Sequence, residues 1–130
     1  MSTSCGIALR TGETYQTIYC HWDGYPENMF TMLSKHYNSL ELASMLISYG
    51  DASSIYEKLD PTPGIIHTFE DPEDGVCVFY HRDRGEDWFS CQSVCYTKSE
   101  LFKQAGFSYI YIFEDGQWNA YHWSGKRVSV

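Results

Sequence analysis

The residues best suited to chemistry stand in two short polar segments, each of which follows a predicted strand. The first segment holds His21, Asp23 and Tyr25, where the strand-like residues 15–22 end and lead into a predicted helix. With the neighbouring Cys20, these residues could supply a nucleophile, a base and a group that orients the base. Cys20 and His21 point to opposite sides of an extended strand, however, so they cannot pair directly. We therefore favour hydrogen-bonded structural roles over catalysis for this segment.

The second polar segment is His81-Arg82-Asp83-Arg84-Gly85-Glu86-Asp87. If the strand predicted at 76–80 continues, Arg82 and Arg84 share one face and could clamp a phosphate or a carboxylate. Because acids outnumber the arginines locally, we favour an internal arginine–carboxylate network that ties loops together. A pocket built from both segments is the alternative, and its candidate ligand-binding residues are His21, Asp23, Tyr25, His81, Arg82 and Arg84.

The cysteines and histidines predict no metal site. Cys91 and Cys95 are separated by three residues, but a second short-spaced pair of ligands, as zinc sites use, is missing from the sequence. The remaining candidate ligands are Cys77, His67, His81 and His122. We expect no metal and no cofactor, assign no catalytic residue, and lean towards a protein that is not an enzyme.

The charge of the chain suits a basic protein partner, although solubility is the explanation that we favour. Seventeen Asp and Glu against nine Lys and Arg give a formal net charge of −8 over 130 residues. This charge repels a phosphate backbone and argues against direct binding of DNA or RNA. Solubility alone is the other explanation of the acidity. The candidate partner-binding residues are the acidic groups of two predicted turns, Glu70, Asp71, Glu73, Asp74, Glu114 and Asp115.

The cysteine count and the chain ends predict a cytoplasmic location. Five cysteines are an odd number and form no paired framework, so we expect reduced thiols. The N-terminal residues lack the basic and apolar runs of a signal peptide, and no run of 18 apolar residues predicts a membrane span.

The local patterns predict a single α+β domain of 130 residues. We expect a mostly antiparallel sheet with N- and C-terminal β-hairpins and about three short helices packed on it. The first hairpin pairs 5–9 with 15–22, whose aromatics on both faces indicate a central strand. The second pairs 107–113 with 118–123 around Asp115-Gly116.

The helices are predicted from caps and apolar spacing. One helix starts at Pro26, with a buried stripe of Met29, Met32, Leu33, His36 and Tyr37. A second, capped by Asn38 and Glu41, buries Leu42, Met45, Leu46 and Tyr49 and stops at Gly50. A third spans 98–105 behind a Thr97–Glu100 capping box. Residues 51–74 are expected to be loops with at most one short strand near 65–69, followed by a strand at 76–80.

Four groups of residues resemble a family of small proteins from bacteriophages, prophages and mobile elements. They are IYCHWDGYPE at 18–27, His36-Tyr37, GDASS at 50–54 and YHRDRGE at 80–86, and the resemblance covers about residues 5–90. It implies a small acidic accessory protein that acts by binding host or rival proteins, including the proteins of nuclease-based immunity. The first hypothesis is therefore an anti-defence, anti-CRISPR-like inhibitor of a basic host protein in the host cytoplasm. The second is a small-molecule or nucleotide-binding or hydrolysing protein with a His/Asp/Arg pocket; self-association is left open.

Overall fold

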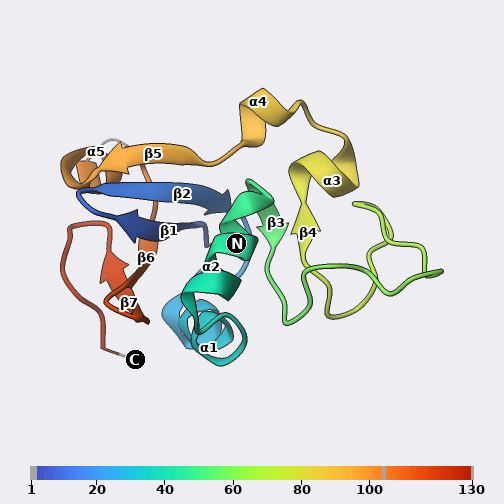
Figure 1. The fold of residues 1–130 in the computed structure, drawn as a ribbon, viewed down its shortest axis with the longest axis horizontal. Helices are drawn as coiled ribbons and strands as arrows, with labels where there is room; N and C mark the ends of the chain where they lie inside the picture. Colours follow the sequence, from blue (N-terminus) through green and yellow to red (C-terminus); the bar gives the residue numbers. More distant parts are fainter. Residues whose placement is uncertain (1–2, 104, 130) are drawn as a thin grey trace.

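A mixed sheet of seven strands organises residues 3–103 and 105–129, the part of the chain that the computed structural model describes (Figure 1). The order is β4-β3-β2-β1-β6-β7, and β5 pairs with β2 as well. This is the α+β class predicted from the sequence. The strands are β1 (Cys5–Thr11), β2 (Thr14–Cys20), β3 (Ala52–Ser54), β4 (Val78–Phe79), β5 (Val94–Thr97), β6 (Tyr109–Glu114) and β7 (Gln117–His122).

Both predicted hairpins are confirmed, and β1 joins them. β1 pairs antiparallel with β2 from Cys5↔Cys20 to Thr11↔Thr14, and it pairs in parallel with β6 on its other edge. In the β6–β7 turn, Asp115 and Gly116 both have positive φ, 53° and 78°, which is the geometry that two-residue hairpin turns favour. β2 is central, as predicted, because it pairs with β1, β3 and β5.

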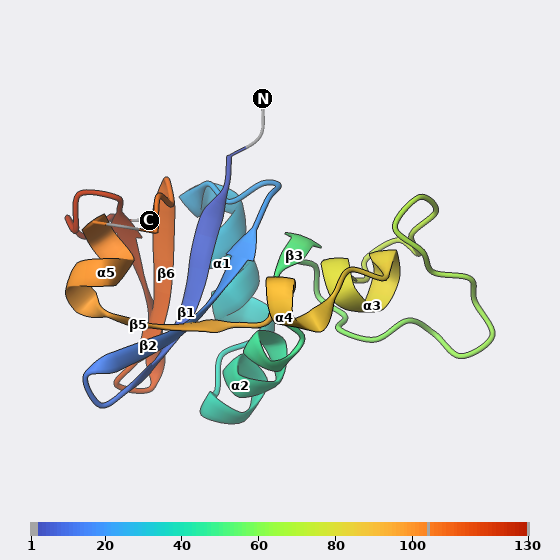
Figure 2. The same ribbon diagram turned by 90° about the horizontal axis from the view of Figure 1, so that it is seen from above.

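Helices cover both faces of the sheet, and each face has its own hydrophobic core. α1 (Pro26–His36) and α2 (Leu40–Ser48) pack with Ile7 and Ile18 in the larger core. α5 (Lys98–Lys103) packs its Leu101 against Ala8 and other residues of the opposite face. Alternation along the strands produces this division, since successive side chains point to opposite faces. Figure 2 shows α1 and α5 on opposite sides of β1 and β6.

α1 follows its prediction, whereas α2 does not. Pro26 stands in the first turn of α1, and Met29, Leu33 and Tyr37 are buried, with Met32 and His36 half-buried. For α2 the predicted cap is wrong: Ser39, not Asn38, caps the helix, and its Oγ accepts from the backbone N–H of Leu42 at 3.1 Å.

The buried face of α2 is also displaced by one residue from the predicted stripe. The helix buries Ala43, Leu46 and Ile47 and leaves Leu42 and Met45 about 40% exposed. The small side chain of Ala43 lets the helix lie close to the sheet, which favours this face over the predicted face with its larger side chains. Gly50 ends the helix as predicted, at φ +84°, where a Cβ would lie 2.5 Å from the Cys91 carbonyl oxygen.

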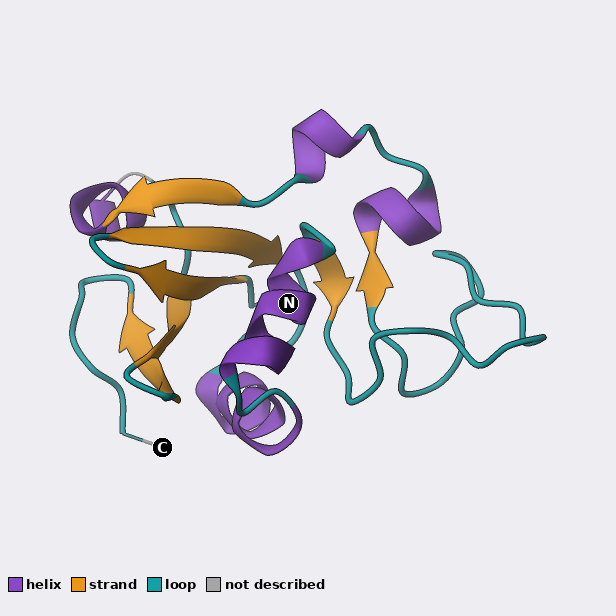
Figure 3. Ribbon diagram, viewed as in Figure 1, coloured by secondary structure: helices purple, strands orange, loops and turns teal. Residues whose placement is uncertain are grey.

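The middle of the chain differs most from the prediction. Residues 65–69, all of them described, contain no strand, which the prediction of at most one allows, whereas β3, within the predicted loop region, and β5 were not predicted. The predicted strand at 76–80 is reduced to Val78–Phe79, because the chain turns at once into α3 (Tyr80–Arg84), followed by α4 (Trp88–Cys91). The described residues thus hold five helices instead of about three (Figure 3).

The third predicted helix is confirmed at its start. Thr97 and Glu100 form the capping box: the Thr97 N–H donates to Glu100 Oε1 at 2.8 Å, and the Glu100 N–H donates to Thr97 Oγ1 at 3.3 Å. α5 ends at Lys103, and residue 104, which the prediction included, lies outside the described residues. Among the helices of the described residues, none has the length and apolar character needed to cross a bilayer.

Candidate functional site

A long loop of residues 55–77, between β3 and β4, projects from the sheet on the side away from β6 and β7 (Figures 1 and 2). Connections of this length without secondary structure of their own are uncommon and are usually functional or disordered. This loop is held at its base, where Lys58 and Val76 form an isolated β-bridge and the Cys77 N–H donates to the Lys58 carbonyl at 2.8 Å. It is therefore an ordered projection.

The carboxylate of Asp83 in α3 fixes the loop from the sheet side. Its side chain is 4% exposed and accepts the backbone N–H of Phe79 at 2.8 Å and the Arg82 guanidinium at 2.9 and 3.1 Å. The Nε2 atom of His67 lies 3.3 Å from the same carboxylate. His67 belongs to the loop: its Nδ1 accepts the Glu73 N–H at 2.9 Å, and its Nε2–H donates to the Cys77 carbonyl at 3.1 Å. The buried acid is thus paired and hydrogen-bonded on both oxygens.

Arg82 adds the second set of anchors. Its Nη1 donates to the Leu59 carbonyl at 2.7 Å and its Nη2 to the Cys77 carbonyl at 2.9 Å, one at each end of the loop. The guanidinium lies over the rings of Tyr49 and Phe79, at 5.3 and 5.0 Å from their centres. The favoured internal arginine–carboxylate network is what the structure shows for Arg82, and the predicted strand continuation that would align it with Arg84 is replaced by a helix.

The tip of the loop is a turn that exposes two isoleucines. The Ile65 N–H donates to the Thr62 carbonyl at 3.0 Å across Pro63-Gly64, and Gly64 has φ +85°, as a type II turn requires. Ile65 is 53% exposed and Ile66 74% exposed. A folded projection that carries adjacent aliphatic side chains to solvent is a candidate contact surface for another protein.

The acidity of the chain is concentrated around this loop. Residues 51–87 hold ten Asp and Glu against three Lys and Arg, so they account for −7 of the formal net charge of −8. Each of the three basic residues has a carboxylate partner: Lys58 with Glu73, Arg82 with Asp83, and Arg84 with Glu86. The loop of residues 55–77 itself holds six of these acids and one base, Lys58, so it is strongly negative, and that base is already paired.

Two of the six acidic candidates serve the fold itself. Glu73 accepts the Thr62 N–H at 2.8 Å and Thr62 Oγ1 at 2.6 Å, and these bonds lower its pKa. Glu114 pairs with Arg10 at 3.3 Å and accepts from Tyr121 at 2.5 Å. Glu70, Asp71, Asp74 and Asp115 are exposed, and none of the ion pairs among the described residues uses them.

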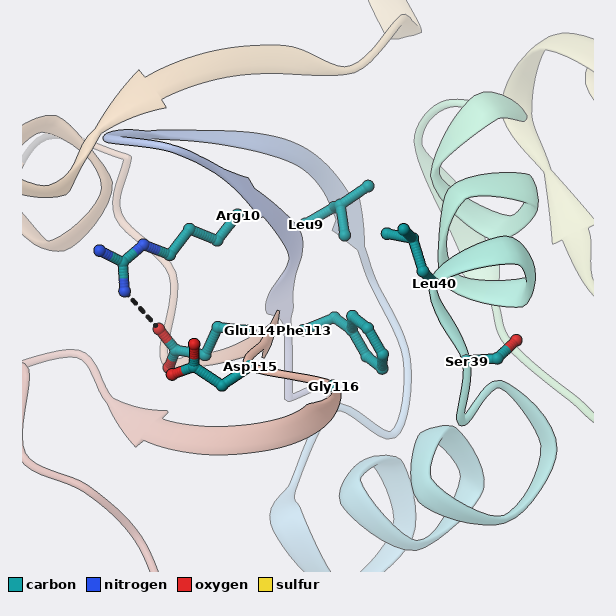
Figure 4. A pocket seen from close by; sticks show the side chains of 8 residues that line it. All are labelled: Leu9, Arg10, Ser39, Leu40, Phe113, Glu114, Asp115 and Gly116. Carbon is teal, nitrogen blue, oxygen red and sulfur yellow. Dashed lines mark hydrogen bonds and ion pairs between the residues drawn. The ribbon is translucent and has the colours of Figure 1, made fainter.

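Figure 4 shows the Arg10–Glu114 pair on the wall of a pocket near the β6–β7 turn. The pocket has a volume of about 350 Å³, and its apolar wall consists of Leu9, Leu40 and Phe113. The acidic wall is partly neutralised by Arg10, so Glu114 differs from the exposed acids of the long loop.

A polar cleft lies beside α3, at the end of β2. It has a volume of about 400 Å³ and brings His21 together with Arg84. Tyr19 and His21 form a hydrogen bond of 2.6 Å between the phenol oxygen and Nδ1. Arg84 lies 3.5 Å from Glu86 and 4.7 Å from the centre of the Phe69 ring. The full lining is Tyr19, His21, Asp51, Tyr80, Arg84, Glu86, Ser90 and Cys91.

Asp51 is the titratable group of the cleft with the clearest perturbation. Burial raises its pKa from the ordinary value of 3.8 to about 6, against the opposing effect of the Tyr19 N–H, which donates to Oδ1 at 2.8 Å. The carboxyl therefore changes charge near neutral pH. The cleft as a whole offers donors and acceptors to a small polar ligand.

The other predicted pocket residues lie elsewhere. His81 and Arg82 line a separate groove of about 510 Å³ with Tyr49 and Trp88. Asp23 stands in a turn at φ 55° and its carbonyl accepts from Asn28 at 2.8 Å. Tyr25 precedes α1 and is 42% exposed. Asp23 and Tyr25 line neither the cleft nor this groove, so the structure does not bring the six residues into one pocket.

Sequence reasoning singled out Arg82 and Asp83 but not the roles of His67 and Asp51. His67 and Asp83 are 16 residues apart, and nothing local to either predicts their contact. Asp51 follows the predicted stop Gly50 and belongs to the GDASS group, but neither feature predicted its place in the cleft. Within residues 3–103 and 105–129, no group of three His, Cys, Asp or Glu side chains is placed to hold a metal ion.

Comparison of the chain with protein-family models, with curated proteins and with solved structures gave no match.

Replacing Arg82 by Lys should lower the free energy of unfolding far more than the same change at Arg84 does. A point-charge ammonium cannot reach the Leu59 and Cys77 carbonyls and Asp83 together, so we expect a loss of about 2–4 kcal/mol in the free energy of unfolding. Arg84→Lys removes one exposed contact and should change stability by less than about 0.5 kcal/mol. Urea unfolding followed by circular dichroism measures both, and equal effects would contradict the anchoring role.

Replacing Asp51 by Asn should make stability less dependent on pH. Between about pH 4 and 6 the folded chain holds the Asp51 proton more tightly than the unfolded chain, so this group's contribution to stability falls as the pH rises. The amide keeps an oxygen for the Tyr19 N–H but carries no charge. Asp51→Asn should therefore be more stable than wild type at pH 7.5, by on the order of 1 kcal/mol after allowance for partial exposure. The gain should vanish near pH 4; in thermal melts, a gain that is constant across this range would refute the assignment.

Proposed function

We propose that this chain is a binding protein that docks its acidic loop, residues 55–77, on a basic partner protein. The observation that carries the proposal is the anchoring of a long acidic loop by Asp83, His67 and Arg82 so that Ile65 and Ile66 are exposed. Such an arrangement lowers the conformational entropy lost on binding, because the loop is ordered before it meets a partner.

The expected partner has an apolar depression surrounded by Lys and Arg. Ile65 and Ile66 would supply the desolvated contact at the centre, and the exposed acids Glu70, Asp71 and Asp74 would supply steering at the rim. This division matches the usual anatomy of a protein interface, in which apolar anchors determine lifetime and rim charges determine the association rate.

The resemblance to small phage and prophage proteins supports a host or rival protein as this partner. Under that proposal the protein is an anti-defence inhibitor, and the basic surfaces of nucleases that bind DNA or RNA are the class of target that an acidic projection fits best. The odd number of cysteines supports action in the host cytoplasm. Inhibition would follow from occupying the partner's binding surface, without turnover of a substrate.

The cleft at Tyr19, His21 and Arg84 favours a second candidate function, the binding of a small molecule or nucleotide. Its volume of about 400 Å³ lies in the range of ligand pockets, and the short Tyr19–His21 hydrogen bond holds the imidazole in place. Arg84 would pair with the phosphate of such a ligand.

A photo-cross-linking residue at position 66 should capture the partner from host lysate, whereas one at the exposed Ser124, after β7, should not. With the captured partner purified, Asp71→Lys with Asp74→Lys should slow association by about tenfold at low salt, because steering is lost. Glu13→Lys with Glu41→Lys makes the same change in net charge on exposed positions outside the loop and is the matched control. Equal capture at positions 66 and 124, or equal on-rates for the two double variants, would reject docking through the loop.

The cleft hypothesis is tested with nucleoside monophosphates as probes. If one binds, it should raise the thermal midpoint of the wild-type protein by a few degrees at saturation, with little dependence on salt. His21→Ala and Arg84→Ala should each abolish the shift, and Lys35→Ala, on the exposed side of α1, should keep it. A shift that survives in His21→Ala and Arg84→Ala would place the ligand elsewhere, and no shift with any monophosphate would count against this class of ligand.

A further inference from the structure

Two of the five cysteines face each other directly across the first hairpin. Cys5 and Cys20 are register partners in the antiparallel β1–β2 pair, and both are fully buried. Side chains at directly opposite positions stand on the same face of the sheet. The Cα atoms of such pairs lie about 4.5–5.5 Å apart, within the range of about 4.4–6.8 Å that a disulfide spans.

We propose that Cys5 and Cys20 form a covalent modification site, an intramolecular disulfide that closes the first hairpin when the chain meets a low-molecular-weight disulfide such as oxidised glutathione. This inference is independent of the proposed binding function. The sequence did not predict it, because 14 residues separate the two cysteines and only the hairpin register makes them neighbours.

The packing around Cys5 and Cys20 favours a bond between these two cysteines over a bond of either one to another cysteine. A Cβ on Gly24 would lie 3.0 Å from Cys5 Sγ and 2.8 Å from its Cβ, so the Asp23-Gly24 turn closes over the sulfur. Cys77 is engaged differently, with its Sγ at 3.4 Å from the hydroxyl of Tyr37, and Cys95 is exposed on β5. Cys5 and Cys20 are therefore held together away from solvent and from larger oxidants.

The bond forms by two thiol–disulfide exchanges. The thiolate of one cysteine attacks a glutathione disulfide, forms a mixed disulfide and releases one glutathione thiolate. The second cysteine then attacks the protein sulfur of the mixed disulfide, the Cys5–Cys20 bond forms and the second glutathione leaves. The chain loses two electrons and two protons, and one glutathione disulfide is reduced to two thiols.

Burial controls when the exchange occurs. Burial, with Cys20 as a neighbour, raises the pKa of the Cys5 thiol well above its usual value, so the thiolate that must attack is scarce in the folded chain. Exchange should be slow after folding and fast while the hairpin is assembling. The bond also removes the thiol proton of Cys20, which now donates weakly to the Trp22 and Ser53 carbonyls at 3.6 and 3.8 Å.

The test is refolding of the reduced, denatured chain in glutathione buffers that range from reducing to oxidising, so that burial does not block access. Free thiols are then trapped by alkylation, and the disulfides are located by peptide mass spectrometry. We expect a Cys5–Cys20 cross-link as the main internal bond, with Cys95 present as a glutathione adduct. The oxidised protein should melt several degrees above the reduced protein, because the cross-link restricts the unfolded chain.

The variants separate this pairing from general oxidation. Cys5→Ala and Cys20→Ala should each lose the internal bond and the redox-dependent melting difference, and Cys91→Ala should keep both. Should either hairpin variant fail to refold, the cross-link map of the wild-type chain decides alone. The proposal is overturned if Cys5 and Cys20 are recovered as free, alkylated thiols from buffers in which Cys95 is fully converted to its glutathione adduct. It is also overturned if either one pairs mainly with another cysteine.

Discussion

The buried carboxylate of Asp83 is the acceptor on which the projecting half of the molecule depends. A charge at 4% exposure is tolerated only when its oxygens are fully hydrogen-bonded, and here the donors are the Phe79 N–H at the end of β4 and the guanidinium of Arg82, the preceding residue of α3. Arg82 also donates to the Leu59 and Cys77 carbonyls, and the Asp83 carbonyl accepts from Phe69, so the same network restrains the 23 loop residues, which have no regular structure of their own. Removal of any one donor would leave the acid partly unpaired and the loop less restrained.

The sheet supplies a rigid base for that loop because β1 is packed on both faces. Its residues alternate between the two cores, with Ile7 in the larger and Ala8 in the smaller, and its two edges are paired with β2 and β6. Gly6 shows how closely the elements approach, since a Cβ there would lie 2.6 Å from the Phe107 ring. β2 carries this order outward to β3 through a single pair, Cys20↔Ala52, and β3 leads directly into the loop.

The parts of the fold that the sequence predicts are those decided by local chemistry. Asp115-Gly116 sets its own hairpin turn, Pro26 starts its own helix, and Thr97 with Glu100 caps α5 without help from elsewhere. The parts that it does not predict depend on residues distant in the chain. β3 and β5 are strands because β2 offers them a hydrogen-bonding edge, and the buried face of α2 is chosen by the sheet beneath it.

The candidate site divides in the same way. Residue type identified Arg82 and Asp83 as an internal network, but the chain turns into a helix at Tyr80, and that turn decides which side chain points where. In an extended strand Arg82 and Arg84 would share a face, whereas in α3 they separate into the loop anchor and the wall of the cleft. Pocket membership in this region was thus unpredictable without the backbone conformation.

α3 also links the two candidate functions physically. Arg82 and Asp83 hold the loop, while Arg84 lies in the cleft and packs on Phe69, a loop residue whose N–H donates to the Asp83 carbonyl at 3.1 Å. A ligand that draws Arg84 into the cleft would act on the same short helix that positions the loop. Because α3 has only five residues and two of its side chains, the buried Asp83 and the partly buried Arg82, hold the loop network, it cannot move without disturbing those contacts. The cleft and the loop are therefore coupled through α3, which contributes side chains to both.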